Sequence, residues 1–83
     1  MSYKITFKKS VSRDLKKINK SQAKRILDRI EKQLSKKADE YPELKGNFAG
    51  LRRCRVGDYR IIFSIIGDTV LITRIGHRRK VYK

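Results

Sequence analysis

The sequence contains one cysteine, one proline, one histidine and no tryptophan. A single cysteine, Cys54, excludes an intrachain disulfide, and no cysteine or histidine cluster indicates a zinc site or another metal centre. No apolar run is long enough to cross a membrane, and the first residues alternate in polarity, unlike a signal peptide. We therefore expect a cytoplasmic protein with no metal or other cofactor and no segment that crosses a membrane.

Acidic residues are also scarce: 8 Asp and Glu stand against 23 Lys and Arg, which leaves a formal net charge of +15. Such an excess repels itself in the folded state, so it indicates a polyanionic partner. Nucleic acid is the first candidate, an anionic membrane surface the second and an acidic protein the third. The 83 residues suffice for a single domain with one modest core.

Two Gly-Asp dipeptides, at 57–58 and 67–68, separate three runs that favour β-strands, over residues 51–56, 59–66 and 69–75. A two-residue loop that begins with glycine suits a type II′ turn, so the pattern predicts a three-stranded antiparallel meander. The register that such loops impose pairs Arg55 with Arg60, Arg53 with Ile62, Ser64 with Leu71 and Arg60 with Ile75.

Directly paired residues point to the same face of a sheet, and the two faces alternate along each strand. One predicted face is apolar and forms the core, with Cys54, Val56, Tyr59, Ile61, Phe63, Ile65, Val70 and Ile72. The other face is open and collects Arg53, Arg55, Arg60, Ile62, Ser64, Leu71, Thr73 and Ile75, with His77 next in the alternation. A like-charge pair such as Arg55 and Arg60 destabilises a sheet unless an anion lies between the two guanidinium groups.

The first half of the chain predicts a strand and two helices. Residues 3–7 alternate in polarity, as in a half-buried strand. A short helix then carries Val11, Leu15 and Ile18, and Ser21 is expected to cap a longer helix. The apolar stripe of the longer helix comprises Ala23, Ile26, Leu27, Ile30 and Leu34.

The helices are expected to pack against the meander, because the apolar stripes of the helices and the apolar face of the meander must both be buried. Their pairing predicts an α+β fold over residues 1–83 with the order β-α-α-β-β-β. A helical hairpin packs on one face of an antiparallel sheet, and the first strand joins an edge of that sheet. The lysines of the helices are most simply a solvated surface.

Three segments resemble the RelE/ParE superfamily of toxins from type II toxin–antitoxin systems, and its RelE-like branch in particular. They are Leu-Lys-Gly at 44–46, Leu-Arg-Arg-Cys-Arg-Val-Gly-Asp-Tyr-Arg at 51–60 and Gly-His-Arg-Arg-Lys-Val-Tyr at 76–82. The resemblance implies an mRNA endonuclease that acts on the ribosome, inhibits translation and is silenced by an acidic RelB-like antitoxin. In that branch the RNA 2′-hydroxyl attacks the phosphate and leaves a 2′,3′-cyclic phosphate, with no metal.

The resemblance also implies roles for particular residues. Arg60 matches the phosphate-binding arginine at the start of the third strand, and Arg78 matches the arginine near the leaving group. Tyr82 matches the tyrosine that stacks on or orients the substrate. Arg53, a further candidate catalytic residue, stands where RelE has a lysine. Lys45, a candidate phosphate ligand, stands where RelE has an arginine in the loop.

One basic group of the family is missing, because Leu51 stands where RelE has another lysine. An arginine is a poor general base, since its guanidinium group stays protonated at physiological pH. We therefore expect His77, whose imidazole titrates near neutrality, to do the acid–base work. Further basic residues expected to bind RNA phosphates are Arg52, Arg55, Arg79 and Lys80.

Two other functions are compatible with the sequence. A toxin of the ParE branch would share the fold but poison DNA gyrase by protein contact, without catalysis. A small RNA-binding module with no activity is the other, although it leaves the Gly-His-Arg-Arg string unexplained. A titratable group beside the arginines is needed only by the enzyme, so His77 and Tyr82 favour the RelE-like function.

Overall fold

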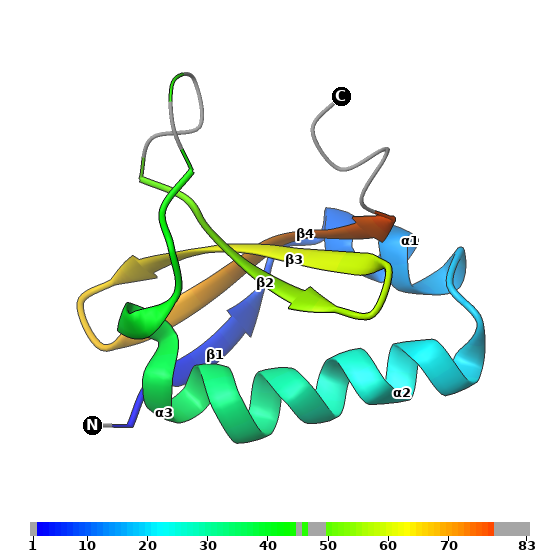
Figure 1. The fold of residues 1–83 in the computed structure, drawn as a ribbon, viewed down its shortest axis with the longest axis horizontal. Coiled ribbons are helices and arrows are strands. Elements are labelled where there is room, and N and C mark those ends of the chain that lie inside the picture. The colour runs from blue at the N-terminus through cyan, green and yellow to red at the C-terminus, as the bar shows by residue number, and fades with distance from the viewer. Residues whose placement is uncertain (1, 45, 47–49, 78–83) are drawn as a thin grey trace.

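The computed structural model describes residues 2–44, 46 and 50–77. Four strands form one sheet in the order β1-β4-β3-β2, and helices lie against one of its faces (Figure 1). The strands are β1 (Lys4–Phe7), β2 (Arg52–Val56), β3 (Tyr59–Ile66) and β4 (Thr69–His77). Between β1 and β2 lie α1 (Ser10–Lys16), α2 (Lys20–Arg29), the π-helical turn η1 (Ile30–Leu34), α3 (Ser35–Lys37) and the 3₁₀ turn η2 (Ala38–Glu40). The predicted α+β fold and its element order are confirmed.

The two hairpin turns are of the predicted kind. Gly57 and Gly67 have φ angles of 59° and 61°, and no other residue type among those described has a positive φ. A positive φ at only the first loop residue is the requirement of a type II′ turn, which glycine meets without strain. The pairs Arg55–Arg60, Arg53–Ile62 and Ser64–Leu71 are therefore present as predicted.

The sheet is mixed rather than antiparallel throughout. Strand β1 joins the edge of the sheet as expected, but it pairs with β4 in parallel. The helical segment returns the chain to the end of the sheet where β1 starts, so β2 and then β4 run in the same direction as β1 (Figure 1). A parallel pair needs such a long crossover, which the helices supply.

The register between β3 and β4 shifts by one residue in the middle of the hairpin. Phe63 pairs with Ile72 while Ile62 pairs with Arg74, so Thr73 is an extra residue in β4. The Thr73 hydroxyl donates to the carbonyl oxygen of Ile62 at 3.1 Å. Such a β-bulge places two residues opposite one and locally bends the strand.

The bulge corrects part of the predicted register. Arg60 pairs with Gly76, not with Ile75. Ile75 instead pairs with Ile61 on the core face, where it is 1% exposed, and His77 pairs with Tyr59 on that same face. Strict alternation fails because one inserted residue exchanges the two faces for everything that follows it.

The longer helix also differs in detail from the prediction. Its N-cap is Asn19, whose side chain accepts the backbone N–H of Ser21 at 2.8 Å, so the predicted cap at Ser21 is wrong. Its buried residues recur every fourth position and extend into the 3₁₀ turn, at Ile26, Ile30, Leu34 and Ala38. In a regular α-helix such a repeat drifts by about 40° per step, because 3.6 residues make one turn. The wider turn η1 offsets that drift and keeps these residues on the sheet.

The core lies between the helices and one face of the sheet. The helical side contributes Val11, Ile18, Ile26, Ile30 and Leu34, and the sheet contributes Cys54, Ile61, Phe63, Val70, Ile72 and Ile75. None of the described helices is both long and apolar enough to span a membrane.

Helix α1 replaces β1 as the neighbour of β4 beyond Ile72. The Ser10 hydroxyl donates to the carbonyl oxygen of Thr73 at 3.4 Å, and the backbone N–H of Ile75 donates to the Asp14 carboxylate at 3.0 Å. The second half of β4, with the bulge, is thus held between β3 and α1.

Candidate nucleic-acid interface

Four arginines share the face of the sheet that points away from the helices, and we call this surface the arginine face. Two of them form the pair Arg55–Arg60, and the other two, Arg53 and Arg74, both pair with Ile62 from opposite sides. The flanking residues Cys54 and Ile61 point to the other face and are buried in the core. The strand register therefore places all four guanidinium groups on one side of the molecule.

The Arg55–Arg60 pair is closely spaced. The backbone N–H of Arg53 donates to the carbonyl oxygen of Pro42 at 3.2 Å, so it points away from β3. Arg53–Ile62 and, two residues on, Arg55–Arg60 are consequently pairs without mutual backbone hydrogen bonds. In such pairs the side chains approach most closely, with Cβ atoms about 4.5–5.5 Å apart.

The four arginines differ in exposure. Arg53, Arg55 and Arg74 are exposed, whereas Arg60 is half-buried and its Nε atom is enclosed. Within the part of the chain that the structure describes, no carboxylate lies within ion-pair distance of Arg53, Arg55 or Arg74. Their charge is therefore not offset by described acidic side chains and remains available to an external anion.

Arg52, a predicted phosphate ligand, does not join the arginine face. Its guanidinium donates to the carbonyl oxygens of Tyr41 at 2.7 Å and Asp39 at 3.2 Å, and it lies 3.4 Å from the Glu43 carboxylate. These contacts tie the segment after η2 to the start of β2. Arg52 thus stabilises the fold of the linker.

His77 does not lie beside the arginines either. It stands on the helix-side face, where its ring meets that of Tyr59 edge to face, with centroids 5.9 Å apart and planes at 80°. The prediction that His77 shares the open face is wrong, because the bulge reverses the alternation before it. The same bulge places Arg74 on the arginine face. The sequence alone does not predict this position for Arg74, because no motif marks the residue and only the strand register shows where it lies.

The remaining predicted site residues lie outside the described part of the chain. These are Lys45, Arg78, Arg79, Lys80 and Tyr82. Among the residues that are described, no group of three or more His, Cys, Asp and Glu side chains is arranged to hold a metal ion.

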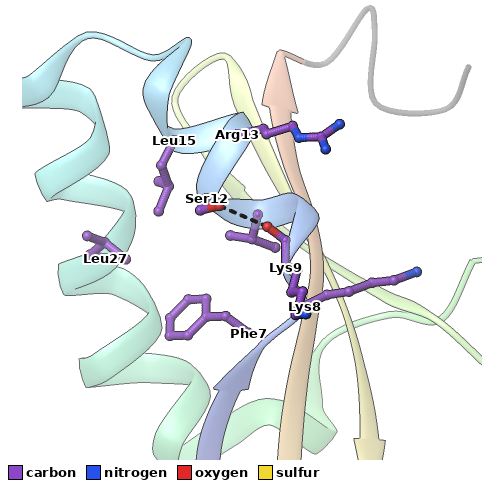
Figure 2. Close-up of a pocket in the computed structure, with 8 residues that line it drawn as sticks. Phe7, Lys8, Lys9, Ser12, Arg13, Leu15 and Leu27 are labelled. Carbon is purple, nitrogen blue, oxygen red and sulfur yellow. Dashed lines mark hydrogen bonds between the residues drawn. The ribbon is translucent and has the colours of Figure 1, made fainter.

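A second surface feature lies on the helical side, between α1, α2 and the end of β1 (Figure 2). It is an apolar groove of about 560 Å³, with Phe7, Leu15 and Leu27 directed into it. Phe7 and Leu27 are 43% and 39% exposed, so Leu27 leaves the helical stripe that the sequence assigns to the core. The rim is cationic, with Lys8, Lys9 and Arg13.

The lone cysteine is part of the core beneath β2. Burial raises the pKa of the Cys54 thiol, and burial likewise raises the pKa of the nearby Tyr41 hydroxyl. A thiol that is 1% exposed and mainly protonated is a poor nucleophile. Cys54 is therefore a packing residue, as the sequence predicts.

The α+β domain carries four arginines on the face of its sheet opposite the helices, which agrees with the RelE/ParE resemblance of the sequence. Residues 5–82 match the sequence profile of the ParE toxin of type II toxin–antitoxin systems, so the chain belongs to this family. It is 33% identical to Toxin RelE3 of Methanocaldococcus jannaschii, over 95% of this chain and 94% of that protein.

Solved structures agree. The toxin–antitoxin complex RelBE2 of Mycobacterium tuberculosis has a chain that is 27% identical, with a TM-score of 0.88 over 94% of this chain and all of that one. The RelB–RelE complex of Methanococcus jannaschii has a chain that is 30% identical, with a TM-score of 0.70 over 92% of this chain and 93% of that one. The protein is thus a type II toxin of the RelE/ParE superfamily.

Proposed function

We propose that this toxin is a metal-independent endoribonuclease that cleaves mRNA on the ribosome and so inhibits translation. The observation that carries the proposal is the Arg55–Arg60 pair on an open face. Two arginines paired directly across neighbouring strands repel each other, and an anion between them removes the repulsion. Arginine also binds phosphate through two parallel hydrogen bonds, which a lysine cannot do.

The proposed cleavage reaction comprises three changes at the scissile phosphate. The 2′-hydroxyl loses its proton and its oxygen attacks the adjacent phosphorus; the bond from phosphorus to the 5′-oxygen breaks; and the departing 5′-oxygen takes up a proton. The products are a 2′,3′-cyclic phosphate and a 5′-hydroxyl. Negative charge accumulates on the phosphoryl oxygens during attack, so fixed cations at that point lower the barrier.

In this proposal Arg60 is the main phosphate ligand, because it is the most enclosed of the four and a less hydrated cation binds an anion more strongly. Arg55 completes the pair. Arg78 near the leaving group and Tyr82 against a base remain part of the proposal through the family resemblance. His77 would have to act from outside the arginine face, so we assign it no proton transfer there.

The toxin's partner in this proposal is an acidic, RelB-like antitoxin, since solved relatives are complexes of RelE with RelB. The groove in Figure 2 suits a segment of such a protein. An amphipathic helix can place its apolar side chains against Phe7, Leu15 and Leu27 while its carboxylates meet the cationic rim. Binding there would also offset part of the net charge of +15.

A second candidate function keeps support from one observation: the matching family profile is that of ParE. By resemblance, a toxin of that branch inhibits DNA gyrase through protein contact and needs no catalytic group. The absence of His77 from the arginine face is compatible with such a toxin. The two functions differ in their target, so one experiment separates them.

The test is expression of the toxin without antitoxin, followed by mapping of mRNA 5′ ends and assay of gyrase supercoiling. We expect new 5′ ends in translated mRNA and unchanged supercoiling. Arg60→Ala should lower cleavage at least a hundredfold, as loss of a transition-state ligand typically does. Arg25→Ala, which removes an exposed arginine from α2, is the matched control and should cleave normally.

Cleavage that survives Arg60→Ala in full would contradict the proposed mechanism. Inhibited supercoiling without new mRNA ends would instead establish the gyrase function. Circular dichroism and thermal unfolding of both variants show whether any loss of activity reflects loss of the fold.

A further inference from the structure

The β-bulge gives the arginine face a second row of cations. The first row consists of Arg55 and Arg60 on neighbouring strands. The second row runs across three strands, Arg53 on β2, Ile62 on β3 and Arg74 on β4. Without the extra residue Thr73, the uninterrupted alternation would pair Ile62 with Thr73 and turn Arg74 to the core face.

The two rows have a defined separation. They lie two residues apart along β2 and β3, which is about 7 Å at the rise of a strand. This is close to the separation of neighbouring phosphates along a single RNA strand. Two strand spacings separate Arg53 from Arg74, about 10 Å between their backbones. The long side chains of both can therefore reach one phosphate above Ile62.

The residue between the two arginines is suited to this arrangement. Ile62 is 4% exposed although it points away from the helices. Its cross-strand neighbours in the register are Arg53 and Arg74, whose methylene stems are long enough to lie along an isoleucine while their charged ends stay in water. The second row therefore presents two cations on an apolar base, with no described carboxylate within ion-pair distance.

We propose that Arg53 and Arg74 form a second phosphate subsite, so that the arginine face binds two successive phosphates of one RNA strand. The pair Arg55–Arg60 holds the phosphate that is cleaved, and the pair Arg53–Arg74 holds a neighbouring one. This inference rests on the proposed function and extends it to the substrate. The ligand is a single strand with at least two adjacent charged phosphates, and Arg74 is a substrate-binding residue.

The first measurement needs no cleavage. Purified toxin is titrated with a fluorescent, fully 2′-O-methylated single-stranded RNA at several salt concentrations. Each phosphate contact contributes about 0.7 to the slope of log K against log salt for a single strand. We expect Arg74→Gln to lower that slope by about this amount, and Arg25→Gln on α2 to leave it unchanged. Equal slopes for wild type and Arg74→Gln would overturn the subsite.

The second measurement identifies which phosphate is bound. Once the cleaved position has been mapped, a neutral methylphosphonate replaces the phosphate on its 5′ side or on its 3′ side. At one of these positions we expect wild-type binding to weaken about tenfold and Arg74→Gln to lose clearly less, because the variant has already lost the Arg74 contact to that phosphate and keeps only that of Arg53. Additive losses at both positions would overturn the assignment.

The two proposals fail in different ways. If Arg60→Ala cleaves like the wild type, the proposed reaction is wrong whatever Arg74 does. If Arg60→Ala is inactive while Arg74→Gln binds and cleaves like the wild type, the reaction stands and the second subsite is wrong.

Discussion

The arginine face and the helical surface are both strongly basic, yet they hold their charges in different ways. Along α2 and η1, lysines and arginines are interspersed with the carboxylates of Asp28 and Glu31, and flexible side-chain stems spread the charge. On the sheet, strand pairing sets the arginines in two rows at fixed distances. A net charge attracts a polyanion, whereas fixed spacing selects the shape of the polyanion.

The two surfaces also differ in what they leave uncovered. The sheet presents charge around one isoleucine, and the helical side presents the apolar groove of Phe7 and Leu27 behind a cationic rim. A bare RNA backbone suits the first surface, and an amphipathic acidic protein suits the second. Both surfaces depend on one small core, although each is expected to bind a different partner.

The largest effect is expected from the core that both surfaces share. Phe63 is completely buried, and its ring meets that of Tyr41 edge to face at 6.1 Å. Phe63→Ala should lower the free energy of unfolding by about 3–5 kcal/mol, the usual result of such a cavity. Urea unfolding measures the change, and RNA cleavage and antitoxin binding should decline together. Independent loss of one of them would mean that the surfaces do not depend on one core.

A smaller effect should separate the surfaces. Leu27→Glu places a carboxylate in the groove, where it repels an acidic partner and loses an apolar contact. We expect antitoxin affinity to fall at least tenfold, about 1.4 kcal/mol, while RNA cleavage is unchanged. Calorimetric titration with the cognate antitoxin measures the affinity. As a control, Lys24→Gln makes the same one-unit change in charge on α2 outside the groove, and equal losses from the two variants would contradict a specific docking surface.

The like-charge pair predicts opposite signs for stability and function. Arg55→Gln removes the repulsion with Arg60 and should stabilise the unliganded protein by about 0.2–1 kcal/mol. The same change should weaken RNA binding, because it removes a phosphate ligand. Thermal unfolding and the RNA titration provide the two readouts. A variant that is both less stable and fully able to bind would show that the pair is structural.

The smallest effect concerns alkaline pH. Burial raises the pKa of the Cys54 thiol, so the unfolded chain loses this proton at a lower pH than the folded protein. The stability from the neutral buried thiol is complete below the unfolded-state pKa, near 8.5, and declines as pH rises through that range. Unfolding free energies measured from pH 7 to pH 9.5 should fall for the wild type and fall less for Cys54→Ala. The same pH dependence of the unfolding free energy in both proteins would contradict a raised pKa of the Cys54 thiol.

Features that depend on neighbouring residues were predictable. Each Gly-Asp turn is local, because only glycine adopts the required positive φ easily, and a two-residue loop dictates the first pairs of each hairpin. The register Arg55–Arg60 follows from the first loop alone. The order of elements and the excess of positive charge also follow from the sequence, so the sequence alone predicts the arginine pair.

Features that depend on contacts between residues far apart in the sequence were not predictable. The bulge at Thr73 belongs to a stretch of β4 that α1 holds through Ser10 and Asp14, more than sixty residues earlier. The bulge exchanges the faces after Ile72, so it admits Arg74 to the arginine face and removes His77 from it. Arg52 is likewise diverted to the linker by carbonyl oxygens of Asp39 and Tyr41.

The division has one physical cause. Backbone preferences and the alternation of polar and apolar residues act over a few residues. The turns, the strand order and the excess of positive charge can therefore be predicted from the sequence. Whether an extra residue is accommodated in a strand depends on the free energy of everything packed beside it. The presence of Arg74 on the arginine face, and the absence of His77 from it, therefore depend on the bulge in β4, a stretch that packs between β3 and α1.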